Sequence, residues 1–495
     1  MTSMSLGERS GEGSPRPRGS RDRVQTIAIV LAHATAAFVS VTACVVLGDE
    51  AREQRLEREL GEVRDELDLL RRRVDGVEEP PASAPDHASA PPDASPPDAS
   101  PPDASTLEWT PPWSGPRVDR PAALRGIRDK PFLLSIWDRA HIGGYTELEY
   151  HSFEDGIQGV AEGFRMHRTN LFLFTDISDT VRFASELEFE TEFDGGANSN
   201  EIEVAVEMAL VDWQLWQEFE LRAGVLLPPL GRVNVNHDGP TRELTERPLV
   251  STWVIPTTLS EPGVGAHGNV AFCEEVALEY EIYAVNGFSV LDADGRLAAP
   301  IDERESLLRE SRSALGGDTN DGLAATGRVG LELFESLAVG GSWHVGTYDE
   351  RGDNQLRIWA GDLAWVHSIV AVEGEVALAD FERDRFARTA GVPDRFWGWY
   401  LQAGAGGMPE CLRRALPNIF GGEGARFGAA LRFDWIDLDG DRGEVIEPGL
   451  TFRPVADTVF KFSYRFTPNS FGSRGVPGTE GFDDEGFVFS FSTYF

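Results

Sequence analysis

The sequence predicts an all-β fold, namely a 16-stranded antiparallel transmembrane β-barrel over residues 131–495. Three observations lead to it. The chain ends in a strand with one aromatic face, a series of sixteen alternating segments precedes this ending, and the connections between the segments alternate between short and long. Single-chain bacterial barrels have an even number of strands, with short turns at one end and longer loops at the other.

The C-terminal strand carries the strongest signal. Its aromatic residues share one parity and its polar residues share the other, so that the two kinds face opposite sides of a strand. The aromatic set is Phe487, Phe489, Phe491 and Phe495, and the polar set is Ser490, Ser492 and Tyr494. A soluble sandwich with such an edge strand is the alternative, but an exposed apolar edge invites pairing with other chains. In a lipid-embedded barrel the aromatic face meets lipid and closure removes the edge.

The preceding strands are marked by alternating polarity and by Gly, Asp, Asn or Pro clusters at their ends. The predicted strands are 142–150, 164–174, 181–190, 201–213, 218–227, 264–273, 276–287, 324–335, 338–348, 355–366, 369–381, 395–405, 425–436, 444–453, 457–467 and 486–495. Sixteen strands enclose an interior wide enough for water.

The lengths of the connections support this count independently. If the C-terminus is periplasmic, every second connection must be a periplasmic turn. These are 176–179, 214–217, 274–275, 336–337, 367–368, 406–424 and 454–456. All but 406–424 are short, and a helix around Cys411 to Leu416 would account for that exception. The long connections, 228–263, 288–323, 382–394 and 468–485, fall at the other end.

The chain before the barrel divides into three further segments. Residues 1–48 hold an apolar run from 24 to 47 after several arginines, which is typical of a secretory signal peptide or a retained membrane anchor. Lipidation at Cys44 is a further alternative. Residues 49–79 show a heptad pattern that predicts a parallel coiled coil, although a helix docked on its own domain also fits. Residues 80–130 are a Pro-, Ala-, Ser- and Asp-rich linker that is too polar to form a core.

Composition narrows the choice of partners. The formal net charge is −37, of which −32 falls on residues 131–495, because that region has 60 acidic and 28 basic residues. So acidic a region argues against nucleic acid as a partner. The three cysteines provide no disulfide framework. No hydrolase, nucleotide or zinc-protease motif is present, so we expect no enzymatic activity, no cofactor and no catalytic residue.

The stretches FGAALRFDWIDLDGD and GLTFRPVADTVFKFSYRF near the end, the sixteen strands and the Pro-rich third external connection, 228–263, resemble the phosphate-selective porin (O/P type) superfamily. The C-terminal Phe pattern is similar to the assembly signature of bacterial outer-membrane barrels, with Thr493 where Tyr is common. The resemblance implies a homotrimer in the outer membrane that passes small solutes, surrounded by lipid and lipopolysaccharide. It also implies the barrel-assembly machinery as a partner.

In porins the third loop narrows the lumen, so the connection 228–263 is the expected constriction. Its candidate residues are Arg232, His237, Asp238, Arg242, Glu243 and Arg247. Each arginine either faces the passage or pairs with Glu243, Glu246 or Asp238 to hold the loop against the wall. Because the barrel region is acidic and holds one lysine, Lys461, the expected pore is general or cation-preferring rather than phosphate-selective.

Two further hypotheses concern the acidic hairpin and the arm. Asp437, Asp439 and Asp441 have the spacing at which a calcium loop begins, although an acidic external hairpin fits the same residues. The arm at residues 49–130 offers an alternative function, a tether from the outer membrane to the cell wall or the inner membrane. The pattern leaves dimer and trimer open.

Overall fold

The computed structural model describes residues 134–137, 139–153, 163–191, 202–216, 218–273, 275–298, 306–313, 315, 322–334, 336–469 and 485–495. The chain divides into two compact units, Met1–Thr106 and Leu107–Phe495, and all that follows concerns the second. The expected signal segment, coiled coil and linker lie outside the described residues. Within those residues, none of the helices has the length and apolar character needed to cross a membrane.

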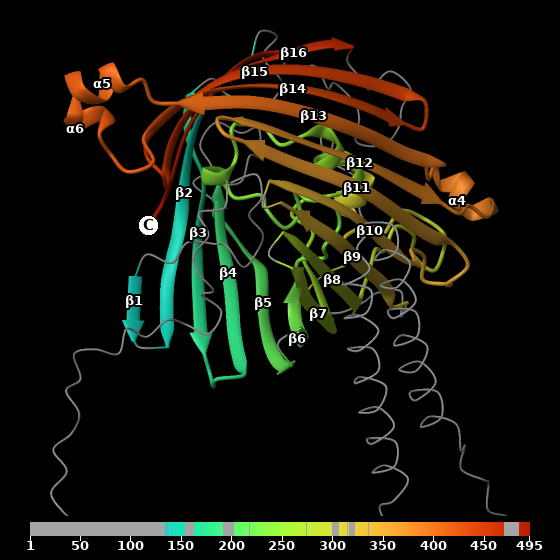
Figure 1. Ribbon diagram of the computed structural model, residues 1–495. Helices are drawn as coiled ribbons and strands as arrows, with labels where there is room; N and C mark the ends of the chain where they lie inside the picture. Colours follow the sequence, from blue (N-terminus) through green and yellow to red (C-terminus); the bar gives the residue numbers. More distant parts are fainter. Residues whose placement is uncertain are drawn as a thin grey trace, which may run out of the picture. The chain divides into compact units, whose positions relative to one another are not determined.

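Sixteen strands form a closed antiparallel ring in which each strand pairs with the next and β17 pairs with β2 (Figure 1). They are β2 (Ala140–Phe153), β3 (Gly163–Asp176), β4 (Val181–Thr191), β5 (Ile202–Trp216), β6 (Phe219–Leu226), β7 (Glu261–Cys273), β8 (Val276–Val285), β9 (Ala324–Leu333), β10 (Leu337–Thr347), β11 (Gln355–His367), β12 (Val370–Phe381), β13 (Arg395–Gly407), β14 (Arg426–Leu438), β15 (Asp441–Val455), β16 (Thr458–Asn469) and β17 (Gly486–Tyr494). Each matches one predicted strand, which confirms the predicted fold class. A short additional strand, β1 (Leu134–Trp137), pairs with the start of β2 and was not predicted.

The C-terminal strand closes the ring. Strand β17 runs beside β2 from Gly486 opposite Phe153 to Tyr494 opposite Tyr145. The pairing continues to the last residue, because the amide of Phe495 donates to the Gly144 carbonyl at 2.9 Å and the Phe495 carbonyl accepts from the Gly144 amide at 3.1 Å. The last residue therefore belongs to the ladder.

The two faces of the wall have opposite character. Phe487 is 46% exposed on the outer face, whereas Ser490 and Ser492 are fully buried on the inner face, so the parity predicted for this strand is confirmed. Large apolar side chains are exposed on other strands as well, among them Leu173, Trp213, Val264, Trp359, Leu431, Leu450 and Phe462. The barrel is thus apolar outside and largely polar inside, the reverse of a soluble protein.

The connections follow the predicted alternation. The turns at one end are short except between β13 and β14, where α5 (Glu410–Ala415) and α6 (Pro417–Phe420) extend from the barrel (Figure 1). The helix expected around Cys411 is therefore present. A helix at the other end, α4 (Arg385–Ala390), joins β12 to β13, and its N-cap Asp384 accepts from the amides of Phe386 and Ala387.

The connection between β6 and β7 runs through the interior of the barrel (Figure 1). Its first helical turn, η3 (Gly239–Thr241), contacts β2 and β17, and its second, η4 (Val250–Val254), contacts β12, β13 and β14. Because these strands lie apart on the ring, a segment that touches both groups must cross the inside. We call residues 227–260 the inner loop.

An apolar core joins the inner loop to one side of the wall. Leu249, Trp253 and Ile255 of the inner loop belong to the same buried cluster as inward-facing residues of β11–β15. The connection between β8 and β9, with α3 (Leu307–Glu310), adds Leu307 and Leu308 to this cluster. The sequence analysis did not anticipate this core, which fills that side of the interior.

The pairing of β5 with β6 leaves no room for a side chain at Gly224, which gives a test of this register. Gly224 has φ +135°, and a Cβ there would lie 2.2 Å from the Ala209 carbonyl oxygen. Gly224→Ala should lower the free energy of unfolding by about 2–4 kcal/mol through backbone strain and overpacking. Urea unfolding in detergent micelles, followed by tryptophan fluorescence, measures this. Gly341→Ala is the control, because its Cβ would meet nothing closer than 4.0 Å; equal midpoints for the two variants would contradict the register.

Candidate functional site

The inner loop is anchored to the wall beside η3. Lys461 of β16 is fully buried, and its Nζ donates to the carbonyl of Gly239 at 2.9 Å and to Oε1 of Glu147 at 3.1 Å. The hydroxyl of Tyr494 donates to Oδ2 of Asp238 at 2.9 Å. A Cβ on Gly239 would lie 2.7 Å from Oε2 of Glu147, so a larger residue there would displace the loop. Three strands thus hold this turn.

The next residues of the inner loop pair with wall residues of opposite charge. Arg242 donates to Oε2 of Glu147 on β2 at 3.1 Å. Glu243 accepts from Arg426 at 2.9 Å and from Arg453 at 3.2 Å. Burial would raise the pKa of the Glu243 carboxyl, but Arg453 and Arg426 outweigh it, so that the pKa lies below its ordinary value of 4.5. Both residues attach the loop to the wall.

A second anchor lies on β14. Arg432, one of the largest fully buried side chains, donates to Asp434 at 2.7 Å and to Glu447 at 2.6 Å. Its Nη1 also donates to the carbonyl of Glu246 in the inner loop at 2.7 Å. Asp434 in turn accepts from the amide of Leu249 at 3.0 Å. A buried arginine hydrogen-bonded to two carboxylates specifies the position of the inner loop more than it adds to the free energy of unfolding.

The start of the inner loop is held by its backbone. Oε2 of Glu375 on β12 accepts from the amides of Arg232 at 2.6 Å and Val233 at 3.3 Å. The amide of Gly231 donates to the hydroxyl of Ser342 at 2.9 Å. Arg232 is itself buried, and its Nη2 atom has no hydrogen-bond partner. The position of Arg232 is therefore set through its main chain.

Arg247 differs from the other loop arginines. Its Nη1 donates to the Thr257 carbonyl at 3.0 Å, whereas its Nε and Nη2 are buried without a hydrogen-bond partner. Burial and the nearby Arg168 lower the pKa of Arg247 to about 10, against the opposing effect of Glu188 and other carboxylates. Its guanidinium thus faces the charged wall of β3 and β4 and remains cationic at neutral pH.

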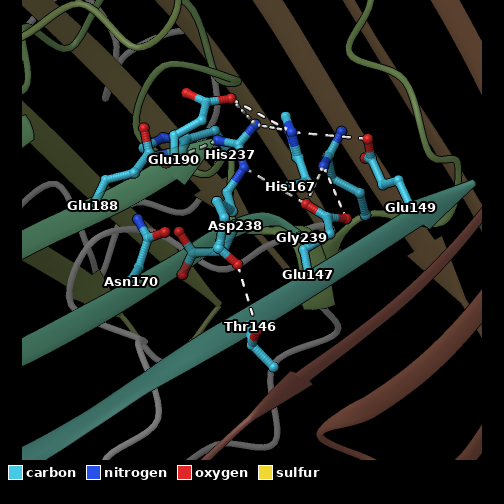
Figure 2. Close-up of polar contacts among 12 residues, drawn as sticks. Thr146, Glu147, Glu149, His167, Asn170, Glu188, Glu190, His237, Asp238 and Gly239 are labelled. Atoms are coloured by element: carbon cyan, nitrogen blue, oxygen red, sulfur yellow. Dashed lines mark hydrogen bonds and ion pairs between the residues drawn. The ribbon is translucent and has the colours of Figure 1, made fainter. Parts of the chain in front are cut away.

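The inner face of β2, β3 and β4 carries many charged side chains, and Figure 2 labels Glu147, Glu149 and Glu188 among them. Arg168 of β3 donates to Oε2 of Glu188 on β4 at 3.0 Å, and Arg165 donates to Oε2 of Glu149 on β2 at 2.8 Å. His237 of the inner loop reaches this wall, with its Nε2 at 3.2 Å from Oε2 of Glu207. Loop and wall therefore meet in a densely charged region on this side.

The structure places the six predicted constriction residues on one loop inside the barrel. They contact different parts of the wall rather than forming one cluster: Asp238 and Arg242 face β2 and β17, Glu243 faces β14 and β15, and His237 faces β5. The sequence reasoning missed the wall residues that hold the inner loop, above all Glu147, Glu375, Arg432 and Lys461. Of these, Lys461 could have been singled out, as the one lysine of the barrel region.

The acidic hairpin joins β14 to β15. Asp439 and Gly440 have φ +56° and +91°, as a two-residue hairpin turn requires. Asp437 accepts from the Gly440 amide at 2.6 Å and from Arg442 at 2.8 Å. Among the described residues, these aspartates are not part of any cluster with metal-ligand geometry.

The anchor at Lys461 predicts a large loss of stability. Lys461→Met leaves Glu147 buried with one cation fewer and frees the Gly239 carbonyl, so the free energy of unfolding should fall by about 3 kcal/mol. Urea unfolding of the full chain in micelles measures it. Arg296→Gln, which removes the exposed pair with Asp294, should change stability by less than about 1 kcal/mol. Unchanged stability of Lys461→Met would mean that this contact does not hold the loop.

The lowered pKa of Glu243 predicts a pH dependence. A depressed folded-state pKa contributes stability above the unfolded value of 4.5, and this contribution disappears as the pH falls through the folded-state value. Wild type should therefore be more stable than Glu243→Gln at neutral pH, and the difference should shrink well below pH 4.5. Urea midpoints of both proteins across this range provide the measurement. A difference that stays constant with pH would contradict the ionised pairing.

Comparisons with known proteins complete the description. No family model matches the chain. An uncharacterized protein of Aquifex aeolicus is 31% identical over 277 residues, which cover 53% of this chain and 60% of that protein. The fold is similar to the outer membrane channel DcaP of Acinetobacter baumannii, with 11% identity, a TM-score of 0.44 and coverage of 74% and 100% of the two chains. OmpF of Salmonella typhi is 10% identical to this chain, with a TM-score of 0.45, and the match covers 72% of this chain and 97% of OmpF. Likenesses of this size concern the course of the backbone only.

Proposed function

We propose that this chain is an outer-membrane pore for the passive diffusion of small hydrophilic solutes or ions, with no enzymatic activity. The observation that carries the proposal is the inverted barrel, closed from β2 to β17, with apolar side chains outside and charged side chains inside. A closed barrel satisfies its backbone hydrogen bonds within itself, which is what a lipid environment demands. Sixteen-stranded barrels are wide enough to enclose a water channel.

The inner loop is the proposed constriction. Its anchors on β2, β12, β14 and β16 keep it inside the ring. Apolar clusters lie on the β11–β15 side and, in smaller form, among β2, β3, β5, β6 and β8, so the charged contacts between the inner loop and β2–β5, where Arg247 lies near Arg168 and Glu188, are the proposed place at which ions are discriminated. The selectivity of the proposed pore is therefore set by this charged region.

The interior favours cations. Among the described residues, buried acidic side chains outnumber buried lysines and arginines. Rings of carboxylates select cations, whereas rings of Arg or Lys select anions. We therefore propose a cation-preferring pore rather than a phosphate-selective one. A homotrimer in contact with lipid and lipopolysaccharide follows from the family resemblance of the sequence and belongs to the same proposal.

Single-channel recording tests the proposal. The full chain, reconstituted in a planar bilayer under a potassium chloride gradient, should give stepwise conductance. Its reversal potential should lie closer to the equilibrium potential of potassium than to that of chloride. Arg247→Gln should move the reversal potential further toward that of potassium, because it removes a cation from the proposed route. Arg296→Gln, an exposed arginine outside the inner loop, is the matched control.

Three outcomes would contradict the proposal in different ways. A folded barrel without conductance would exclude the pore. Conductance with anion preference would contradict the role given to the acidic interior. An identical reversal potential in wild type and Arg247→Gln would place the selective region elsewhere. Chemical cross-linking of the protein in mild detergent tests the trimer separately.

A further inference from the structure

We propose that Asn170, Glu186, Glu207 and His237 bind one divalent transition-metal ion, with Zn²⁺ as the best-fitting representative, and that the ion fastens the inner loop to the wall. This site goes beyond solute diffusion and does not depend on it. Three strands and the inner loop supply the residues: Asn170 lies on β3, Glu186 on β4 and Glu207 on β5, while His237 belongs to the loop. All four are buried.

The ligand atoms converge. One carboxylate oxygen from Glu186, one from Glu207 and one ring nitrogen of His237 all lie within 4.8 Å of one another. Two carboxylates and an imidazole are a donor set that divalent transition metals accept. The separation between Nε2 of His237 and Oε2 of Glu207 is 3.2 Å, close to the ligand–ligand distance in a tetrahedral zinc site.

The imidazole of His237 is oriented as a metal ligand would be. Its Nδ1 lies 3.0 Å from the backbone carbonyl of Asn234, an acceptor, so Nδ1 carries the proton. This leaves Nε2, at 3.2 Å from Oε2 of Glu207, directed at the carboxylates. Histidine ligands of metals almost always donate their other ring nitrogen to a carbonyl or a carboxylate, which fixes ring and tautomer.

Asn170 supplies the independent observation. It is fully buried, and its Nδ2 donates to Oε1 of Glu186 at 2.9 Å and to Oε2 of Glu207 at 3.0 Å. The amide thus occupies the place between the two carboxylates where a cation would sit. Its Oδ1 is buried with no hydrogen-bond partner. A half-turn of the amide exchanges the two atoms, and Oδ1 then faces the site as a fourth ligand.

Two other groups of this kind lie on the inner wall, but their carboxylates already bind cationic side chains. In the first, Asp212 accepts two hydrogen bonds from Arg222, and Glu220 pairs with Arg182. In the second, Glu147 binds Lys461 and Arg242, and Glu149 binds Arg165. Glu186 and Glu207 both accept from Nδ2 of Asn170, an amide that can turn to present its oxygen to a metal.

The chemistry favours transition metals over calcium or magnesium. The latter prefer oxygen ligands alone, whereas an imidazole nitrogen suits zinc, copper, iron and nickel. Two cations lie near the site: Arg168 pairs with Glu188, and Arg247 interacts electrostatically with Glu188 and Glu207, so a dication would share the Glu207 charge with Arg247. Bound metal would join β4 and β5 directly to the inner loop, where Nε2 of His237 already lies 3.2 Å from Oε2 of Glu207.

The test measures Zn²⁺ binding to the tag-free full chain in detergent by isothermal titration, with the bound metal per chain checked by mass spectrometry after dialysis. Wild type should bind one Zn²⁺ that His237→Gln and Glu207→Gln bind at least about 10-fold more weakly. His267→Gln is the matched control, because His267 makes the same 3.2 Å contact with a carboxylate, that of Asp212, outside the site. Heat-modifiable migration on gels shows that each variant is folded.

A gain-of-affinity variant keeps the test decisive where a loss variant fails to fold. Asn170→Asp adds a carboxylate at the fourth ligand position and should tighten Zn²⁺ binding. Absence of Zn²⁺ binding in wild type would overturn the site. So would undiminished binding by His237→Gln and Glu207→Gln, and so would equal or weaker binding by Asn170→Asp. Because the readout is binding, a barrel that conducts no ions leaves this result unaffected.

Discussion

The closed ladder of backbone hydrogen bonds is the constraint on which the other features of this barrel depend. Closure from β17 to β2 leaves none of the sixteen ring strands as an edge and fixes which side chains point outward. Once Phe487 faces outward, Ser490 and Ser492 must face inward, and the same alternation applies around the ring. The polar residues of each strand therefore point into the barrel. Where the inner loop covers them, it must supply their hydrogen-bond partners.

The inner loop meets this requirement in two different ways. Against β11–β15 it buries apolar side chains such as Trp253 and Ile255, which need no partners. Against β2–β5 and β14–β16 it offers carbonyls and charges to buried wall residues, among them Lys461 and Arg432. Buried ion pairs are costly to desolvate and costly to break, so they specify one position of the loop more than they stabilise the fold.

The sequence alone was sufficient for the strands but not for the interior. Alternating polarity and turn residues locate every strand of the ring to within a few residues, because both signals are local. The contacts of the inner loop are not local: Lys461 and Gly239 are 222 positions apart, and nothing near either residue points to the other. The apolar core was missed because residues 249–255 read as part of a loop, although Leu249, Val250, Trp253, Val254 and Ile255 form an apolar run.

The fixed position of the loop bears on how selectivity arises in the proposed pore. The average charge of the barrel region is strongly negative, yet many of its carboxylates are already bound to arginines of the wall, as Asp212 is to Arg222 and Asp362 to Arg328. Charges of opposite sign that are paired largely cancel at a distance, whereas a charge without an ion-pair partner does not. Arg247, whose described hydrogen bond is to the neutral Thr257 carbonyl rather than to a carboxylate, should therefore influence an ion more than a paired arginine does. A metal held by the neighbouring His237 and Glu207 would add positive charge beside it, so metal occupancy and ion preference should be coupled through this one region of the inner loop.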